Sequence, residues 1–203
     1  MAIFNVRIHM QELFMIGGPN GAGKTTSAMK LLPGLLNCEE YVNADAIAAA
    51  LSPFHPETTA IQAGRLMLDR IHSLAAEKKV FSFETTMASL SFAPFLKKCK
   101  EQGYKINVLY LWLQNPELAI DRVALRVQNG GHNVPEQDIR RRYYRGLSNF
   151  FKIYVPLADK WLLCNNSGEN TVHIASGDEK SPLTVHHSQD WLKIQEHQNE
   201  LRE

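Results

Sequence analysis

The residues from Gly18 to Thr25 combine glycines, a lysine and a threonine in the spacing G-x-x-x-x-G-K-T. In this pattern the glycines let the backbone turn, so that successive N–H groups converge on a phosphate. The lysine then reaches the β- and γ-phosphates of a nucleotide, and the threonine hydroxyl ligates Mg²⁺. An apolar run precedes the motif and a helical pattern follows it, which favours a phosphate loop over a simple turn. The predicted nucleotide contacts are Gly18, Pro19, Asn20, Gly21, Ala22, Gly23, Lys24, Thr25 and Thr26.

The segment Asn43-Ala44-Asp45 closes the second predicted strand. In an open parallel sheet, residues just beyond the carboxyl ends of strands line the ligand crevice. A carboxylate at Asp45 can accept the proton of an acceptor hydroxyl as that hydroxyl attacks a γ-phosphate. The alternative is that Asp45 caps the helix that follows it. We also expect Asn43 to lie beside the acceptor.

The segment Glu84-Thr85-Thr86 closes the third predicted strand. The carboxylate of Glu84 is predicted either to lie near Mg²⁺ or to bind a polar acceptor, with Thr85 and Thr86 beside it. The alternative is a solvated strand end. Since the sequence lacks an apolar run ending in aspartate, Glu84 is the one candidate for an acid near the metal.

Arginines flank the flexible segment 129–133 in the second half of the chain. Arginines on either side of a glycine hinge can close over transferring phosphates and stabilise the charge that develops there. We expect Arg126, before the hinge, and Arg141 or Arg145, after it, to contact phosphate. Arg140 and Arg142 are predicted to lie on a solvated face, as most charge runs do.

The segment Asn165-Asn166-Ser167-Gly168 follows the last core strand. It has the composition of an ordinary turn. In a phosphate-loop domain this position also lies beside the nucleotide base, so Asn166 is a candidate nucleotide contact.

Short apolar runs alternate with longer helical patterns, which predicts a parallel sheet with helical crossovers. We expect an α/β three-layer sandwich with a helical lid and a central, mainly parallel sheet of five strands, plus a weaker sixth at 171–175. A helix is predicted over 58–78, and Asn115 is predicted to cap another that runs through Val127. Pro135 is predicted to begin a further helix. The predicted strands are Leu13–Ile16, Tyr41–Val42, Val80–Phe83, Ile106–Leu113 and Trp161–Cys164.

The composition is that of an ordinary globular protein, with 44% hydrophobic and 21% charged residues. A net charge of +1 gives no general attraction to nucleic acid or to an anionic membrane, so we expect neither as a partner. The three cysteines have no metal-binding spacing and indicate a reducing compartment. We expect one domain over 1–203, with its core at about 11–175 and a helical appendage at 176–203. The expected location is the cytoplasm.

These motifs together resemble the zeta toxin family, specifically its shorter chromosomal members, from about Leu13 to Gly168. The phosphate loop alone is common to many families, whereas the ordered set is much more specific. The set consists of residues 17–26, Asn43-Ala44-Asp45, Phe83-Glu84-Thr85-Thr86, Gly130-Gly131-His132-Asn133-Val134-Pro135 and Arg140-Arg141-Arg142-Tyr143.

The resemblance implies a P-loop kinase that uses ATP and Mg²⁺ to phosphorylate the 3′-hydroxyl of the sugar in UDP-N-acetylglucosamine. It also implies a protein antitoxin that blocks the ATP site. Carried over, Lys24 holds the phosphates, Thr25 ligates Mg²⁺ and Asp45 is the general base. Glu84 and Thr86 would then face the nucleotide sugar.

The resemblance also assigns Arg126 to the lid. Well-studied members carry a further lid arginine near the position of Gly131 and His132 in this sequence. His132 has no permanent charge at pH 7, so the identity of the acceptor stays open at this point. We expect His132 to lie beside the acceptor.

Two other interpretations remain. One is a different small-molecule phosphotransferase, similar to chloramphenicol or gluconate kinases, which share the phosphate loop and the strand-end acid. The other is a regulatory module that hydrolyses ATP slowly and acts through a partner. Such a module needs no acid at the second strand end, so Asp45 favours the enzyme.

Overall fold

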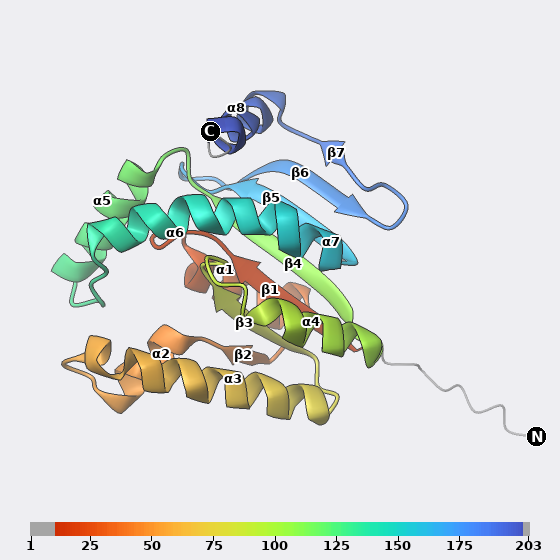
Figure 1. Ribbon diagram of the computed structural model, residues 1–203. Coiled ribbons are helices and arrows are strands. Elements are labelled where there is room, and N and C mark those ends of the chain that lie inside the picture. The colour runs from red at the N-terminus through yellow and green to blue at the C-terminus, as the bar shows by residue number, and fades with distance from the viewer. Residues whose placement is uncertain (1–10, 201–203) are drawn as a thin grey trace, which may run out of the picture.

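A computed structural model describes residues 11–200, which form a seven-stranded sheet in the order β2-β3-β1-β4-β5-β6-β7 (Figure 1). Strands β1 to β5 are parallel to one another, whereas β6 and β7 are antiparallel to their neighbours. The strands are β1 (Glu12–Gly17), β2 (Glu40–Val42), β3 (Phe81–Thr85), β4 (Lys105–Trp112), β5 (Lys160–Asn165), β6 (Val172–Asp178) and β7 (Thr184–Val185).

The helices follow the strands as crossovers, as expected for a parallel sheet. They are α1 (Lys24–Leu35), α2 (Ala44–Leu51), α3 (Ala60–Ala76), α4 (Phe92–Glu101), α5 (Pro116–Gln128), α6 (Glu136–Asn149), α7 (Val155–Leu157) and α8 (Ser188–Glu200). A 3₁₀ turn, Pro56–Thr59, precedes α3, and a π-helical segment, Phe150–Tyr154, joins α6 to α7.

The five predicted parallel strands and the weaker sixth are all present, so the predicted α/β fold class is confirmed. The sheet extends further than predicted, because β6 continues to Asp178 and β7 pairs with it. At two residues, β7 is too short for its sequence to show the alternation that identifies a strand. The predicted helix around Trp191 is α8.

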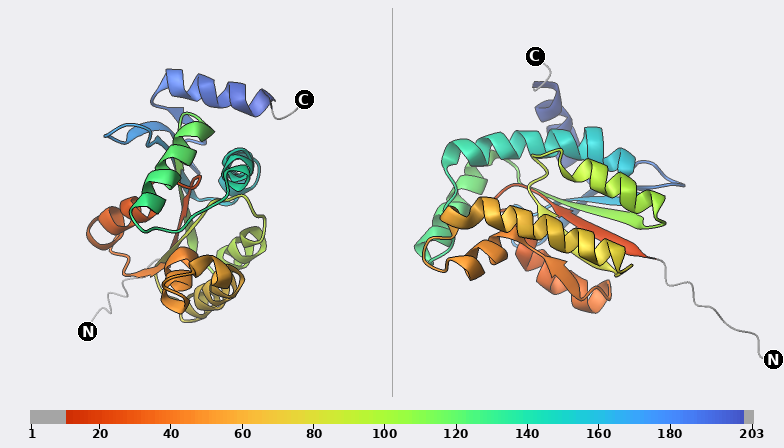
Figure 2. Two further views of the ribbon diagram at one scale, coloured as in Figure 1. Left: turned by 90° about the vertical axis from the view of Figure 1, so that its left-hand side faces the viewer. Right: turned by 60° about the horizontal axis from the view of Figure 1, so that its bottom comes forward.

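The helices cover the two faces of the sheet unequally (Figure 2). The larger core packs α3, α4 and α6 against one face and includes Met15, Phe83 and Tyr110. The opposite face carries α1, which covers Phe14 and Ile16 on β1. The part of that face formed by β4 to β6 therefore lies open along a groove.

Helix α6 is held close to the carboxyl end of β3, and this fixes the residues that it carries. A Cβ at Gly146 would lie 2.3 Å from the carbonyl oxygen of Thr86, so only glycine permits this approach. The Tyr143 hydroxyl donates to the carbonyl of Leu113 at 2.6 Å. The Asn149 amide donates to the carbonyl of Met87 at 2.8 Å. The apolar residues of α6 that face the sheet, among them Ile139 and Leu147, are buried.

Helix α5 begins as the sequence predicts. The Asn115 side chain accepts from the amide of Leu118 at 2.8 Å, and Pro116 occupies the first turn. This cap directs α5 across the end of the sheet, where it meets the phosphate loop. Within residues 11–200, none of the helices has the length and apolarity needed to cross a bilayer.

A buried carboxylate at the opposite end of the sheet joins β4 to β5. Asp159 accepts from the backbone amide of Ile106 at 2.8 Å and lies 3.2 Å from the ammonium of Lys105. Burial raises the pKa of this carboxyl. The amide of Ile106 and the ammonium groups of Lys105 and Lys100 lower the pKa by more than burial raises it. The net result is a pKa below the usual 3.8.

Asp159→Ala should lower the free energy of unfolding by about 1–3 kcal/mol at neutral pH, since it leaves a buried amide unpaired. A depressed folded-state pKa contributes stability above 3.8, which is lost as the pH falls through the lower folded value. Urea unfolding at pH 7 and at pH 3 should therefore show a smaller difference between wild type and variant at the lower pH. An equal difference at both values would contradict this account. Exposed Glu179→Ala is the control.

Candidate active site

The loop between β1 and α1 has the backbone conformation that the phosphate motif predicts. Gly21 and Gly23 have φ angles of 78° and 80°, which side-chain-bearing residues rarely adopt. A Cβ at Gly23 would also lie 2.8 Å from the side-chain amide nitrogen of Asn166. Helix α1 begins at the next residue, so its N-terminus faces the centre of the loop.

Lys24 folds over its own loop. Its ammonium donates to the carbonyls of Gly18 and Pro19 at 3.0 and 2.9 Å. Burial lowers the pKa of this ammonium from 10.5; nearby Glu84 and Asp45 oppose the shift, and Arg126 and Arg142 add to it. Two acids and two arginines from four separate segments thus lie within electrostatic range of Lys24.

Thr25 is joined to the end of β3 by a hydrogen bond. The hydroxyl of Thr25 donates to the Glu84 carboxylate, at 2.9 Å from Oε2. The parallel register between β1 and β3 pairs Ile16 with Glu84, which brings the carboxylate to the start of α1. Glu84 is itself 9% exposed, so it is not the solvated strand end that the sequence left open.

Tyr41, at the end of β2, completes this cluster. Its hydroxyl donates to the Glu84 carboxylate and accepts from the side-chain amide of Asn43 at 3.3 Å. Burial, together with the adjacent carboxylate of Glu84, raises the pKa of Tyr41 well above its usual 10. The phenol therefore remains a hydrogen-bond donor, and it holds Glu84 toward Thr25.

The donor set at this point suits Mg²⁺. The Thr25 hydroxyl and the Glu84 carboxylate offer hard oxygen ligands within 2.9 Å of each other. No cluster of three or more His, Cys, Asp or Glu able to hold a metal occurs within residues 11–200. Mg²⁺ that is bound mainly by nucleotide phosphates needs only one or two protein oxygens, so the two observations agree.

Asp45 does not cap α2, because that role belongs to Asn43. The Asn43 side chain accepts from the amides of Asp45 and Ala46 at 2.7 and 3.2 Å. Asp45 instead lies in the first turn, exposed, and its carboxylate makes no hydrogen bond to another described residue. The alternative of a purely capping Asp45 is therefore wrong.

A cavity of about 770 Å³ opens from Lys24 and Asp45 towards α3 and α6. It brings together most of the predicted acceptor-binding residues, since Asn43, Glu84, Thr85 and Thr86 all line it. The other polar and charged residues in its lining are Asn20, Arg65, Ser89, Ser91, Arg141, Arg142 and Arg145.

The two predicted residues at the glycine hinge contact each other. Arg126 donates to the backbone carbonyl of His132 at 2.7 Å, and its side chain packs against Gly131. The ring of His132 is absent from the lining of the acceptor cavity, so the structure does not support its predicted contact with the acceptor. Arg126 lies within electrostatic range of Lys24, as the lid role requires.

Which arginines of α6 lie on the surface and which line the cavity differs from the sequence-based prediction. Arg140 forms ion pairs with Glu117 and Glu136, so its predicted surface position is confirmed. Arg142 was predicted to lie on the same solvated face, and this is wrong. Its half-buried guanidinium points into the cavity and lies 3.5 Å from the side-chain oxygen of Asn20 in the phosphate loop. Arg141 lines the cavity and also pairs with Asp138 at 2.6 Å.

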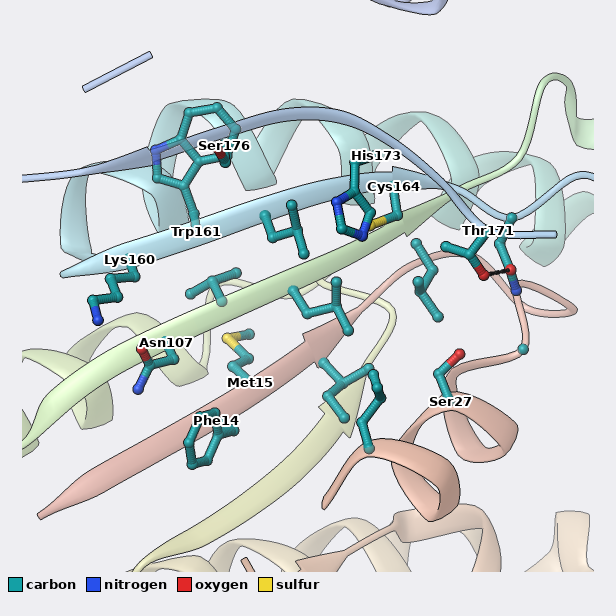
Figure 3. Close-up of a pocket in the computed structure, with 18 of the residues that line it drawn as sticks. Phe14, Met15, Ser27, Asn107, Lys160, Trp161, Cys164, Thr171, His173 and Ser176 are labelled. Atoms are coloured by element: carbon teal, nitrogen blue, oxygen red, sulfur yellow. Dashed lines mark hydrogen bonds between the residues drawn. The ribbon is translucent and has the colours of Figure 1, made fainter. Parts of the chain in front are cut away.

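The nucleotide side of the phosphate loop faces a separate groove of about 1150 Å³ along the open face of the sheet. Thr26 and Asn166 line it. The Asn166 side chain donates to the carbonyl of Ala22 at 2.8 Å, so the loop after β5 contacts the phosphate loop, and the predicted contact of Asn166 with the nucleotide stays a prediction. In Figure 3, Ser27 and Thr171 lie at this end of the groove, whereas Asn107 and Lys160 lie at the other.

Three residues of the site escaped the sequence analysis. Tyr41 belongs to none of the recognised motifs, and Arg142 lies in the motif Arg140-Arg141-Arg142-Tyr143 but was predicted to lie on a solvated face. Arg122 was recognisable only as one helix turn before Arg126. Its guanidinium donates to the carbonyls of Asn166 and Ser167, both at 2.8 Å, and so fastens the loop after β5 to α5.

Comparison with known proteins agrees with this geometry. The family model described as Zeta toxin matches residues 7–177. An uncharacterised protein of Haemophilus influenzae is 28% identical over 126 residues, which cover 62% of this chain and 88% of that protein.

Two solved structures share the fold. The AvrRxo1-ORF1:-ORF2 complex with ATP superposes with a TM-score of 0.70 at 18% identity, covering 90% of this chain and 63% of that chain. The PezAT chromosomal toxin–antitoxin system of Streptococcus pneumoniae gives a TM-score of 0.61 at 15% identity, covering 94% and 87%. This chain thus spans under two thirds of the AvrRxo1 chain that it matches.

The sheet topology and the phosphate loop define the class of this protein as a P-loop kinase-like α/β fold. Because the matching model covers most of its length, the chain belongs to the Zeta toxin family.

Arg142→Ala should lower turnover by roughly 10²–10³, since its guanidinium faces the phosphate loop where charge develops during transfer. Arg126→Ala should also depress turnover more than it weakens ATP binding. Arg140→Ala, which removes only surface ion pairs, is the control and should be near neutral. Turnover under saturating ATP and the ATP dissociation constant distinguish these effects. A silent Arg142 with a critical Arg140 would overturn the assignment.

Tyr41→Phe should raise the Mg²⁺ concentration needed for half-maximal turnover by roughly 10–100-fold, because it removes the donor that orients Glu84. The variant keeps the ring and its packing. Tyr104→Phe is a matched control, since it removes a hydroxyl that bonds the carbonyl of Lys79, far from the site. Mg²⁺ titrations at fixed ATP measure the difference. Identical curves for the two variants would show that Tyr41 has no role at the metal.

Proposed function

We propose that this protein is a kinase that transfers the γ-phosphoryl group of ATP to a hydroxyl of a nucleotide sugar. The observation that carries the proposal is the position of Asp45. Its carboxylate has no hydrogen-bond partner among the described residues, lines the acceptor cavity and lies close enough to Lys24 to oppose the lowering of that group's pKa by burial. A free carboxylate beside the phosphate-binding lysine is where the base of a phosphoryl transfer belongs.

In the proposed reaction the acceptor oxygen attacks the γ-phosphorus while the bond to the β–γ bridging oxygen breaks and ADP leaves. The proton of the attacking hydroxyl passes to the carboxylate of Asp45. Lys24 and the guanidinium of Arg142 stabilise the charge that builds on the transferring oxygens. Thr25, with Glu84 behind it, would hold Mg²⁺, which supplies further charge neutralisation when bound.

The charge of the acceptor cavity supports an anionic acceptor. Arg65 on α3 and Arg145 on α6 both line it, and neither forms an ion pair with another described residue. Unpaired arginines that face one cavity suit phosphate groups, because guanidinium binds phosphate oxygens in pairs. A volume of about 770 Å³ also accommodates a ligand of nucleotide-sugar size. Together with the family, this supports the 3′-hydroxyl of UDP-N-acetylglucosamine as the acceptor.

We also propose that the chain is the toxin of a toxin–antitoxin pair and that a protein antitoxin binds it. The support is the family and the toxin–antitoxin system to which the PezAT structure belongs. Co-purification of this chain with the product of a neighbouring reading frame, and loss of its toxicity on co-expression, would test this proposal.

The acceptor is tested by incubating the full chain with labelled ATP and a panel of hydroxyl compounds. The panel contains UDP-N-acetylglucosamine, other nucleotide sugars, free N-acetylglucosamine, gluconate and chloramphenicol. We expect label on the nucleotide sugar and none on free N-acetylglucosamine, gluconate or chloramphenicol. Label on gluconate or chloramphenicol alone would favour the other small-molecule kinases, and release of phosphate without any labelled acceptor would favour the slow ATPase.

Asp45→Asn should lower turnover by roughly 10²–10⁴, the usual contribution of a positioned base. ATP affinity should stay within a few fold, because the substitution preserves size and leaves the helix cap on Asn43 intact. Calorimetry gives the affinity, and the labelled transfer gives the turnover. Asp69→Asn, on the exposed face of α3, is the matched control. Unchanged turnover in Asp45→Asn would remove this residue from catalysis.

A further inference from the structure

Helix α8 lies beyond the part of the chain that the family model matches. The match ends at residue 177, and α8 spans Ser188–Glu200. The helix packs at the end of the molecule near β5 and β6 (Figures 1 and 2). Ile194 of this helix is fully buried, and the ring centroids of Trp191 and Phe151 are 5.8 Å apart in an edge contact. The helix is therefore part of the packed structure.

One acidic side chain of α8 points into the molecule. Asp190 is 6% exposed, and a buried carboxylate needs hydrogen-bond donors to offset its desolvation. The donor from outside α8 and its preceding turn is Asn165, whose side-chain amide lies 2.8 Å from Oδ2 of Asp190. The other neighbours are His187 at 3.2 Å and Lys193 at 3.9 Å.

Asn165 also contacts the loop after β5. Its side-chain oxygen accepts from the backbone amide of Ser167 at 2.9 Å. The hydroxyl of Ser167 in turn accepts from the amide of Gln114 at 2.9 Å, after β4. Asn165 is thus the point at which α8 meets the loop.

The same loop contacts the phosphate loop. Asn166 donates to the carbonyl of Ala22, and its own carbonyl accepts from Arg122, both at 2.8 Å. Asp190 is therefore connected to the phosphate loop by the hydrogen bonds of Asn165 and Asn166 and by the backbone that joins these two neighbouring residues. Each of these bonds involves a buried or half-buried side chain or a backbone group.

We propose that Asp190 is a positioning residue for ATP, which acts through Asn165 to hold the loop 165–168 against the phosphate loop. A loop that is already ordered loses less conformational entropy when the nucleotide binds. The role of α8 is then to raise ATP affinity without touching the acceptor. This inference rests on ATP binding at the phosphate loop and is independent of the acceptor's identity.

The test compares ATP affinity of the full-length chain, measured by calorimetry, in three variants. Asp190→Ala should weaken ATP binding by about tenfold, in keeping with loss of one hydrogen bond to a charged group. Asp190→Asn should stay within about threefold of wild type, because its amide oxygen can still accept from Asn165. Glu196→Ala, on the exposed face of the same helix, should match wild type. Turnover at saturating ATP should be the same in all of them.

A second measurement separates positioning from a loss of overall stability. If Asp190 acts through Asn165, adding Asp190→Ala to Asn165→Ala should produce no further loss of ATP affinity. The amide of Ser167 should also exchange its hydrogen faster in Asp190→Ala than in Glu196→Ala. Asn165→Ala removes the same contact from the other side and provides the test if Asp190→Ala does not fold.

The outcomes are distinguishable. Equal ATP affinity in wild type and Asp190→Ala, or an additive loss in the double variant, would overturn the positioning role. Failure of the wild-type chain to bind ATP at all would instead overturn the proposed kinase function.

Discussion

The hydroxyl of Thr25 donates to the carboxylate of Glu84 across two neighbouring parallel strands, and the rest of the site is arranged around that contact. The pairing of Ile16 with Glu84 determines which residue of β3 reaches the start of α1. Tyr41 then orients the carboxylate from a third strand. Burial and the charges of Arg126 and Arg142 lower the pKa of Lys24, and the negative charge of Glu84 opposes that shift. Without this acid, the positive charges gathered for phosphate would repel one another in the free protein.

The two sides of the phosphate loop have different surroundings, because the helices cover the sheet unequally. On the side of the larger core, α6 is held against the ends of β3 and β4 by the close approach of Gly146 to Thr86 and by hydrogen bonds to the carbonyls of Met87 and Leu113. That rigid support aims Arg142 into the acceptor cavity. On the other side α1 leaves the face of β4 to β6 open, and a wide, partly apolar groove runs along it.

The family match ends at residue 177, within β6, so β7 and α8 lie beyond the matched residues. Strand β7 pairs with β6, and α8 returns across the end of the sheet to β5. A carboxylate buried at such a junction is costly unless every partner is in place. The contact between Asp190 and Asn165 is therefore specific, and it links α8 to the loop that contacts the phosphate loop.

The sequence by itself determined the elements and the local chemistry of this protein. Periodicity, the Asn115 cap and the glycine pattern depend on neighbours a few residues apart, so five parallel strands and the phosphate loop were predictable. Contacts between distant segments were not. Nothing near Tyr41 indicates that it meets Glu84, 43 residues away, and Arg142 stands 122 residues from Asn20. Arg140 and Arg142 look alike in sequence, yet one pairs with surface acids and the other faces the cavity. The tertiary structure decided between them, because the packing of α6 against β3 sets which side of the helix points inward.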